Sequence, residues 1–169
     1  MQVYLASDHT GLELKKTIHQ YLTELGYEVE DCGAFDYDKD DDYPDFISKA
    51  AEAVSKDPEN NKAIIFGGSG QAEMMLANKY KGVRTALFYA PAIPTQAADI
   101  TGRMSEDPYE IVKLTRQHNN ANILSLGIRF LTEDQAKQAV KIWLETSFPG
   151  EERHVRRINK IAKIENSLS

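Results

Sequence analysis

The sequence predicts an α/β fold in which a doubly wound, five-stranded parallel sheet forms a single domain. Short apolar runs alternate along the chain with longer segments of helical apolar spacing. Such alternation gives parallel strands joined by right-handed crossovers, and 169 residues is the length of one ordinary domain. We therefore expect one Rossmann-like domain over residues 1–169, with ligands binding beyond the carboxyl ends of the strands.

The first half of the chain supplies three of the expected strands. Residues 3–6 and 63–66 are short apolar runs expected to form strands, and the second of these runs into glycines. Residues 27–30, in which Tyr27 and Val29 alternate with two glutamates, are expected to form a further strand. Residues 11–25 carry apolar side chains at mostly helical spacing, and Gly26 is a signal for the end of that helix.

The second half continues the alternation. A helix is expected over residues 71–80, strands over 85–89 and 122–126, and a helix with a threonine N-cap over 132–146. A basic helix is expected at the end of the chain, within residues 152–166.

Composition excludes several classes of function. The chain has 20 Lys and Arg against 26 Asp and Glu, a net charge of -6, which disfavours general binding to nucleic acid or to an anionic membrane. Its single cysteine, Cys32, allows neither a disulfide framework nor a cysteine-based zinc site within one chain. With no long apolar run and no signal-peptide pattern at the start, we expect a cytoplasmic protein.

Two segments are expected to be irregular. Residues 36–45 contain six aspartates, and a solvated acidic loop is favoured over an ion site because the ligand spacing of a calcium loop is not met. Residues 91–109 contain three prolines and a glycine, and a long connection of this kind near a site is often a lid.

The strongest local signal is the glycine-rich turn between a buried strand and a helix at residues 67–73. The backbone N–H groups of Gly68, Ser69 and Gly70 could cradle a phosphate or the oxyanion of an enediolate, although a purely structural tight turn fits as well. Glu73 lies in the first turn of the following helix, either compensating the helix dipole or acting as a general base beside the turn.

Polar residues follow or precede other strands. Asp8 and His9 come directly after the first strand, where they could bind the polar groups of a sugar, or where Asp8 could simply cap the next helix. His118 and Asn119 precede the fifth strand. His118 could act as an acid/base and Asn119 could contact a ligand, or both could be ordinary turn residues.

The basic helix offers a further set of cations. Arg153 and Arg157 are four residues apart and share one face of that helix. Such a pair suits bidentate binding of a phosphate, and salt bridging is the structural alternative.

Together these motifs resemble one family. The sequences DHTG, GGSGQAE, ANK, RQHNNAN, G-x-R and RHVRR occur here in the order found in ribose-5-phosphate isomerase B, a family that includes the subunits of galactose-6-phosphate isomerase. The resemblance covers nearly the whole chain. It implies cofactor-independent and metal-independent interconversion of D-ribose 5-phosphate and D-ribulose 5-phosphate, a step of the pentose phosphate pathway, through an enediolate. It also implies a homodimer, or a dimer of dimers, with each active site at a subunit interface.

The resemblance assigns roles to individual positions. It makes Asp8 and His9 sugar-binding residues, with Asp8 a possible partner in ring opening, and makes His118 the acid/base that opens the furanose. It makes Gly68, Ser69 and Gly70 the anion hole, in which Ser69 also relays a proton, and makes Asn119 a sugar contact. The phosphate site consists of Arg129, Arg153 and Arg157.

The sequence departs from many relatives at two places. The cysteine base that many of them carry at the position of Gly67 is absent, and a second branch of the family uses a glutamate that matches Glu73, so Glu73 is expected to be the base. The segment 92–112 is longer than the link usual in relatives, which leaves the substrate open. The alternatives are an isomerase of a six-carbon sugar phosphate, such as allose 6-phosphate or galactose 6-phosphate, and a non-catalytic sugar-phosphate-binding module.

Overall fold

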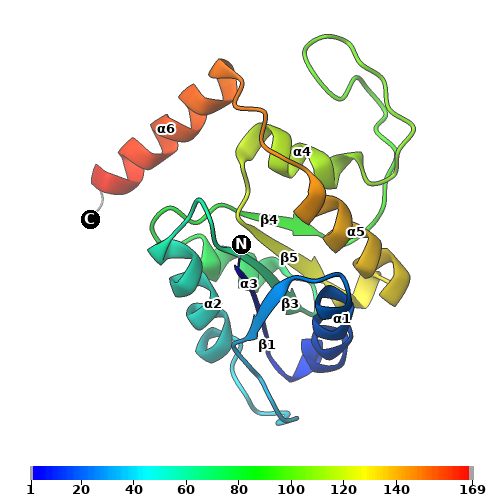
Figure 1. Cartoon of the computed structure of the whole chain (residues 1–169), viewed down its shortest axis with the longest axis vertical. Helices are drawn as coiled ribbons and strands as arrows, with labels where there is room; N and C mark the ends of the chain where they lie inside the picture. The colour runs from blue at the N-terminus through cyan, green and yellow to red at the C-terminus, as the bar shows by residue number, and fades with distance from the viewer. Residues whose placement is uncertain (1, 168–169) are drawn as a thin grey trace.

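The computed structural model describes residues 2–167 and is built on a single parallel sheet (Figure 1). Its strand order is β2-β1-β3-β5-β4, and every pairing is parallel. All five predicted strands are confirmed to within one or two residues. They are β1 (Gln2–Ser7), β2 (Glu28–Asp31), β3 (Lys62–Gly67), β4 (Thr85–Phe88) and β5 (Ile123–Gly127).

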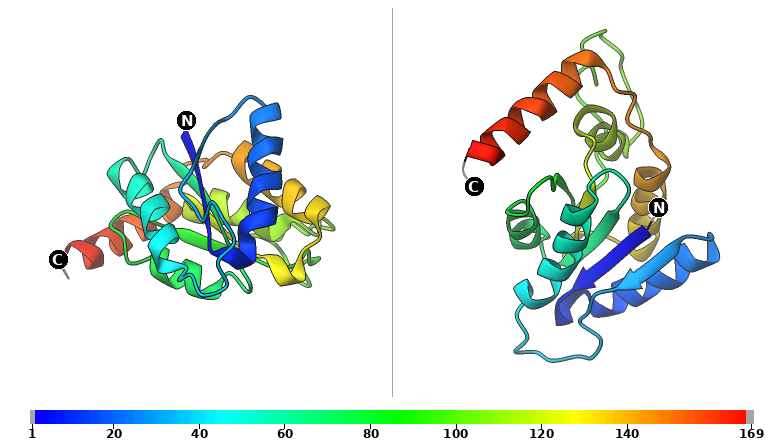
Figure 2. Two further views of the ribbon diagram at one scale, coloured as in Figure 1. Left: turned by 90° about the horizontal axis from the view of Figure 1, so that it is seen from below. Right: turned by 60° about the vertical axis from the view of Figure 1, so that its left-hand side comes forward.

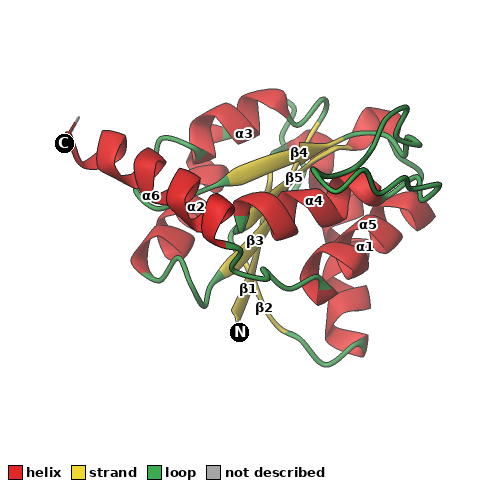
Figure 3. Ribbon diagram, turned by 90° about the horizontal axis from the view of Figure 1, so that it is seen from above, coloured by secondary structure: helices red, strands yellow, loops and turns green. Residues whose placement is uncertain are grey.

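Helices lie on both sides of the sheet, as Figure 3 shows and as the predicted doubly wound fold requires. The side chains of β3 alternate between the two sides: Ile64 and Phe66 pack against α1, α4 and α5, whereas Ala63 and Ile65 pack against α2 and α3. Within residues 2–167 the six α-helices are α1 (Leu12–Glu24), α2 (Pro44–Lys56), α3 (Gln71–Ala77), α4 (Glu110–Asn119), α5 (Glu133–Glu145) and α6 (Glu152–Ser167).

Two of these helices, α2 and α4, were not predicted. The buried side chains of α2 are Ile47, Ala50, Ala51 and Val54, which lie on one face at helical spacing, and Pro44 starts the helix at a position where proline is tolerated. The expected acidic loop therefore ends where α2 begins. The predicted end of α3 is wrong by three residues, since the helix ends at Ala77 rather than at residue 80. The predicted threonine N-cap of α5 is confirmed.

Two parts of the chain stand away from the sheet. The connection between β4 and α4 loops outward, and α6 extends from the body beside α4 (Figures 1 and 2). Within residues 2–167, no helix combines the length and the apolar character that crossing a membrane would need.

Candidate active site

The order of the strands places a crevice between the carboxyl ends of β1 and β3. The chain winds outward from β1 in opposite directions, to β2 on one side and to β3 on the other, and ligands bind at such a switch point in open α/β sheets. Ser7 of β1 pairs with Phe66 of β3, so Asp8 and Gly67, the next residue of each strand, leave the sheet together. The predicted sugar-binding pair and the predicted glycine turn therefore share one crevice.

The side chain of Glu73 points back to the end of β3. A Cβ atom placed on Gly67 would overlap the carbon and both oxygens of the Glu73 carboxyl group. The Glu73 residue is only 5% exposed. A glutamate that merely compensated a helix dipole would have no need of burial, so this geometry favours the interpretation of Glu73 as a base.

The electrostatic surroundings suit that role. Burial raises the pKa of the Glu73 carboxyl, the negative charge of Asp8 raises it further, and a hydrogen bond from a backbone group lowers it. A carboxylate with a raised pKa is a stronger base than one free in water.

The glycine turn is fixed from β5. Gly70 has a φ of +73°, and its carbonyl oxygen accepts a hydrogen bond of 2.7 Å from the Ser125 hydroxyl. The Gln71 N–H approaches the Ser69 hydroxyl oxygen at 3.4 Å, so the Ser69 side chain stays at the turn. Hydrogen bonds within the chain therefore hold the backbone of the turn in place.

Arg129 lies against the same turn. Its backbone N–H donates to the carbonyl of Gly68 at 3.1 Å, and a Cβ atom on Gly68 would lie 3.0 Å from the guanidinium carbon. The structure therefore brings together Asp8, His9, Gly68, Ser69, Gly70, Glu73 and Arg129 at the carboxyl edge of the sheet.

Sequence reasoning missed one polar residue of this region, Asp41. Its carboxylate contacts Nδ1 of His9 at 2.5 Å and accepts hydrogen bonds from the His9 backbone N–H at 3.0 and 3.2 Å. The prediction of a uniformly solvated acidic loop is wrong at this residue, because the loop folds back to β1. Nothing in a run of aspartates distinguishes the one that turns inward.

Asp8, His9 and Asp41 each offer a ligand atom, and these atoms lie within 4.8 Å of one another. The donors are already engaged, since His9 Nδ1 contacts Asp41 and the Asp8 carboxylate accepts from the Thr10 N–H at 2.9 Å. These bonds satisfy the group without a cation, and we assign no metal to it.

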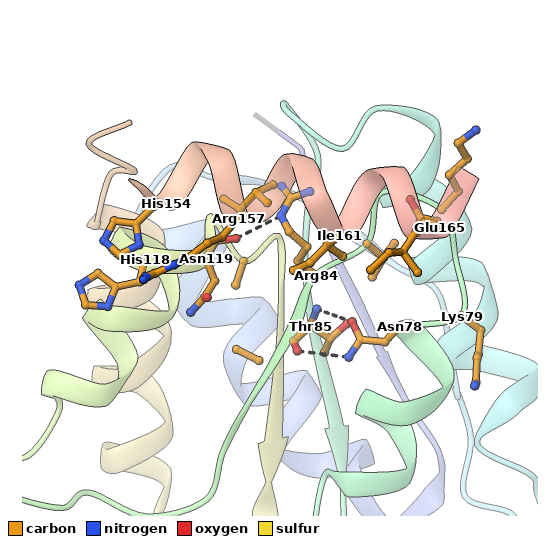
Figure 4. Close-up of a pocket in the computed structure, with 16 residues that line it drawn as sticks. Asn78, Lys79, Arg84, Thr85, His118, Asn119, His154, Arg157, Ile161 and Glu165 are labelled. Carbon is orange, nitrogen blue, oxygen red and sulfur yellow. Dashed lines mark hydrogen bonds between the residues drawn. The ribbon is translucent and has the colours of Figure 1, made fainter. Parts of the chain in front are cut away.

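A second group of predicted residues gathers on α4 and α6. The imidazole rings of His118 and His154 stack with centroids 4.3 Å apart and planes 13° from parallel. Figure 4 shows the two rings side by side, with Arg157 one turn further along α6. These side chains line a groove of about 980 Å³, and Asn119 beside them accepts a hydrogen bond from Arg84 Nε through its carbonyl oxygen at 3.1 Å.

The buried imidazole of His154 is incompletely bonded. Burial, together with the positive charges around it, lowers the pKa of His154, so the ring stays neutral near neutral pH. Its Nε2 atom has no hydrogen-bond partner among residues 2–167. Arg153, the other predicted cation of α6, pairs with Glu151 at 2.8 Å.

The two groups lie at opposite ends of the strands, one at their carboxyl ends and the other at their amino ends. Helix α4 ends at Asn119 and leads into the amino end of β5, whereas Gly127 at its carboxyl end pairs with Gly67. The five residues of β5 represent about 13 Å of strand at the usual rise of roughly 3.3 Å per residue. One chain therefore does not bring His118, Asn119, Arg153 and Arg157 to Glu73.

Comparison with known proteins gives a consistent result. A family model described as "Ribose/Galactose Isomerase" matches residues 3–102 and 98–161. "Ribose-5-phosphate isomerase B" of Mycolicibacterium paratuberculosis is 38% identical over 167 residues, which is 99% of this chain and 93% of that protein. "Probable ribose-5-phosphate isomerase B" of Mycoplasma genitalium is 39% identical over 163 residues, covering 96% of this chain and 95% of that protein.

Solved structures agree in fold over the whole chain. Ribose-5-phosphate isomerase B from Mycoplasma genitalium with bound ribulose-5-phosphate has a TM-score of 0.84 and 37% identity, covering 98% of this chain and 96% of its own. The Clostridium thermocellum ribose-5-phosphate isomerase B has a TM-score of 0.83 and 37% identity, with both chains covered completely.

Proposed function

The chain belongs to the ribose/galactose isomerase family, and we propose that it interconverts D-ribose 5-phosphate and D-ribulose 5-phosphate. One observation carries the proposal: a buried carboxylate, that of Glu73, fills the space beside Gly67 at the rim of a preformed glycine turn. An aldose–ketose isomerase needs this combination, because a base must act on carbon beside donors that stabilise the resulting oxyanion.

In the proposed reaction the open-chain aldehyde lies over the glycine turn. Glu73 takes the proton from C2, and the electron pair moves to form the C1–C2 double bond while negative charge develops on O1. The N–H groups of Gly68, Ser69 and Gly70 stabilise that charge, and one such donor is worth about 3 kcal/mol in comparable sites. Glu73 then returns the proton to C1, and the Ser69 hydroxyl relays the proton that leaves O2 and reaches O1.

The other residues bind and prepare the sugar. Asp8 and His9 hold its hydroxyl groups, and His118 opens the furanose with Asp8 as a proton partner. Asn119 contacts the sugar. The phosphate is held by guanidinium groups, which match its geometry and fix the position of C2; these are Arg129, Arg153 and Arg157.

We further propose that two copies of the chain form each active site. His118 and Glu73 lie at opposite edges of one sheet, and α6 stands off the body beside an open groove (Figures 1 and 4). In a two-fold symmetric dimer, the α4–α6 region of one protomer would meet the glycine turn of the other, and two equivalent sites would result. Sedimentation equilibrium tests the first requirement, since a monomer at assay concentration would contradict the proposal.

Activity can be tested directly. Purified protein with ribose 5-phosphate and a chelator should yield ribulose 5-phosphate, and solvent deuterium should enter at C2. Binding without exchange would indicate a non-catalytic sugar-phosphate module. A higher kcat/KM for allose 6-phosphate than for ribose 5-phosphate would favour the six-carbon alternative, in which the long segment 92–112 reshapes the sugar pocket.

A further inference from the structure

The acidic segment before α2 contains one aspartate unlike the others. Of the six aspartates between residues 36 and 45, five are exposed. The sixth, Asp41, turns toward the carboxyl end of β1, and its side chain is only 9% exposed. A carboxylate loses hydration when it is buried in this way, so its new contacts must compensate that loss.

Among residues 2–167, the hydrogen bonds of the Asp41 carboxylate are all to His9. Both Asp41 oxygens accept from the His9 backbone N–H, at 3.0 and 3.2 Å, and one of them contacts Nδ1 of the ring at 2.5 Å. The ring of Tyr37, from the same segment, meets the His9 ring edge to face, with centroids 5.7 Å apart and planes at 81°. Asp41 therefore contacts both the backbone N–H and the ring nitrogen of His9, and Tyr37 contacts the ring itself.

We propose that Asp41 is a positioning residue of this isomerase, holding the His9 imidazole with its proton on Nδ1 so that Nε2 is directed to the sugar. The proposal deepens the proposed function, because it assumes that His9 binds substrate. It makes part of the acidic segment a component of the active site.

The chemistry of imidazole supports this assignment. A carboxylate can only accept, so the nitrogen that contacts Asp41 must carry hydrogen, and Nε2 is the ring nitrogen that remains for a ligand. The hydrogen bond to Asp41 raises the pKa of His9, the negative charges of Asp8 and Asp38 add to this, and burial opposes it. In the charged form Nε2 also donates, and a sugar hydroxyl oxygen accepts a charge-assisted hydrogen bond of this kind well.

The kinetic test compares two isosteric changes in one segment. Asp41→Asn keeps the shape of the side chain but removes the charge, so we expect kcat/KM for ribose 5-phosphate to fall roughly ten- to hundredfold, mainly through KM. The control, Asp36→Asn, makes the same charge change at an exposed position at the other end of the segment and should stay within about twofold of wild type. Equal behaviour of the two variants would overturn the proposal.

A double-variant comparison separates positioning from general support of the loop. If Asp41 acts through His9, adding Asp41→Asn to His9→Gln should cause no further loss of kcat/KM. A loss as large as that in the wild-type background would show that Asp41 acts independently of His9, and would overturn the proposal.

The tautomer of His9 can be measured without any variant of Asp41 and without activity. In ¹⁵N NMR spectra of the wild-type protein, with the His9 signal assigned by its disappearance in His9→Gln, Nδ1 should be protonated at every pH at which the protein is folded. A neutral ring with bare Nδ1 would overturn the proposal. If wild type binds ribose 5-phosphate but does not isomerise it, the proposed function fails while the NMR result still decides the coupling of His9 and Asp41.

Discussion

The carboxyl edge of the sheet and the α4–α6 region are constructed differently, although both carry predicted site residues. At the carboxyl edge, Glu73 and the glycine turn are buried and fixed by backbone contacts within one chain. In the α4–α6 region, His118 and Arg157 line an open groove on outer helices. The difference fits the proposed division of labour, in which the carboxyl ends of the strands would hold the reacting carbons and the helices of a second chain would provide cations and a proton donor.

The largest expected effect tests the first region alone. Glu73→Gln preserves the size of the side chain but cannot accept the C2 proton, so kcat should fall roughly 10²- to 10⁴-fold with little change in KM. Steady-state kinetics with ribose 5-phosphate measure this, and solvent deuterium exchange at C2 should disappear in parallel. Turnover near the wild-type rate would remove Glu73 from the role of base.

The next prediction joins the two regions. Glu73→Gln and His118→Ala should each be nearly inactive, but subunits mixed by unfolding and refolding together should regain about one quarter of wild-type activity. Half of the randomly formed dimers are then hybrids, and each hybrid has one of its two sites intact. Recovery should be absent when either variant is refolded alone. No recovery in mixed dimers shown to be hybrid would mean that Glu73 and His118 act in the same chain.

A smaller effect is expected when the base is displaced rather than removed. Gly67→Ala places a methyl group where the Glu73 carboxyl lies, so that carboxyl must move. A misplaced catalytic group typically costs about 10²-fold, and we expect a loss of this order in kcat. Gly26→Ala is the matched control, because it is strained by a φ of +84° yet meets no neighbour within 4 Å, and should change stability but not kcat. Unchanged kcat in Gly67→Ala would contradict the described position of Glu73.

The smallest effect concerns pH. Glu73 must be ionised to act as a base, so kcat/KM should fall as the pH drops through its raised pKa. Asp8→Asn removes a negative charge that raises this pKa, and the acidic limb of the profile should therefore move to lower pH. Burial is the larger cause of the raised pKa and persists in the variant, so the acidic limb should move only part of the way back toward the ordinary range of a glutamate. A movement to higher pH would contradict the coupling between Asp8 and Glu73.

The sequence predicts the sheet well because most of its strands are short apolar runs, and the acidic strand β2 follows the turn signal of Gly26. The sequence patterns did not predict helices α2 and α4, and the reason differs between the two helices. Helix α2 has a regular apolar face that includes Ile47 and Val54. It begins within an aspartate-rich stretch, and such a composition is typical of a solvent-exposed loop. Helix α4 buries polar side chains beside Val112, among them Glu110 and Arg116, so the apolar signal of its inner face is weak.

The residue types of the site were also visible in the sequence, whereas their arrangement was not. Motifs identified Glu73 and His118, but only the strand register shows that they lie at opposite edges of the sheet. Asp41 could not be identified at all, because its inward turn depends on the path of the loop and not on its neighbours in sequence. Tertiary packing decides which distant residues come together, and local sequence patterns carry no information about it.

The shared space of Gly67 and Glu73 has a consequence for how such enzymes change over time. A side chain at residue 67 and a carboxylate from residue 73 compete for one volume. In a lineage that exchanged a glutamate base for a cysteine at the earlier position, the cysteine would displace the glutamate carboxyl from its present place. An ancestor that carried both would therefore have had a weakened glutamate base, which favours a direct exchange over a long period with both.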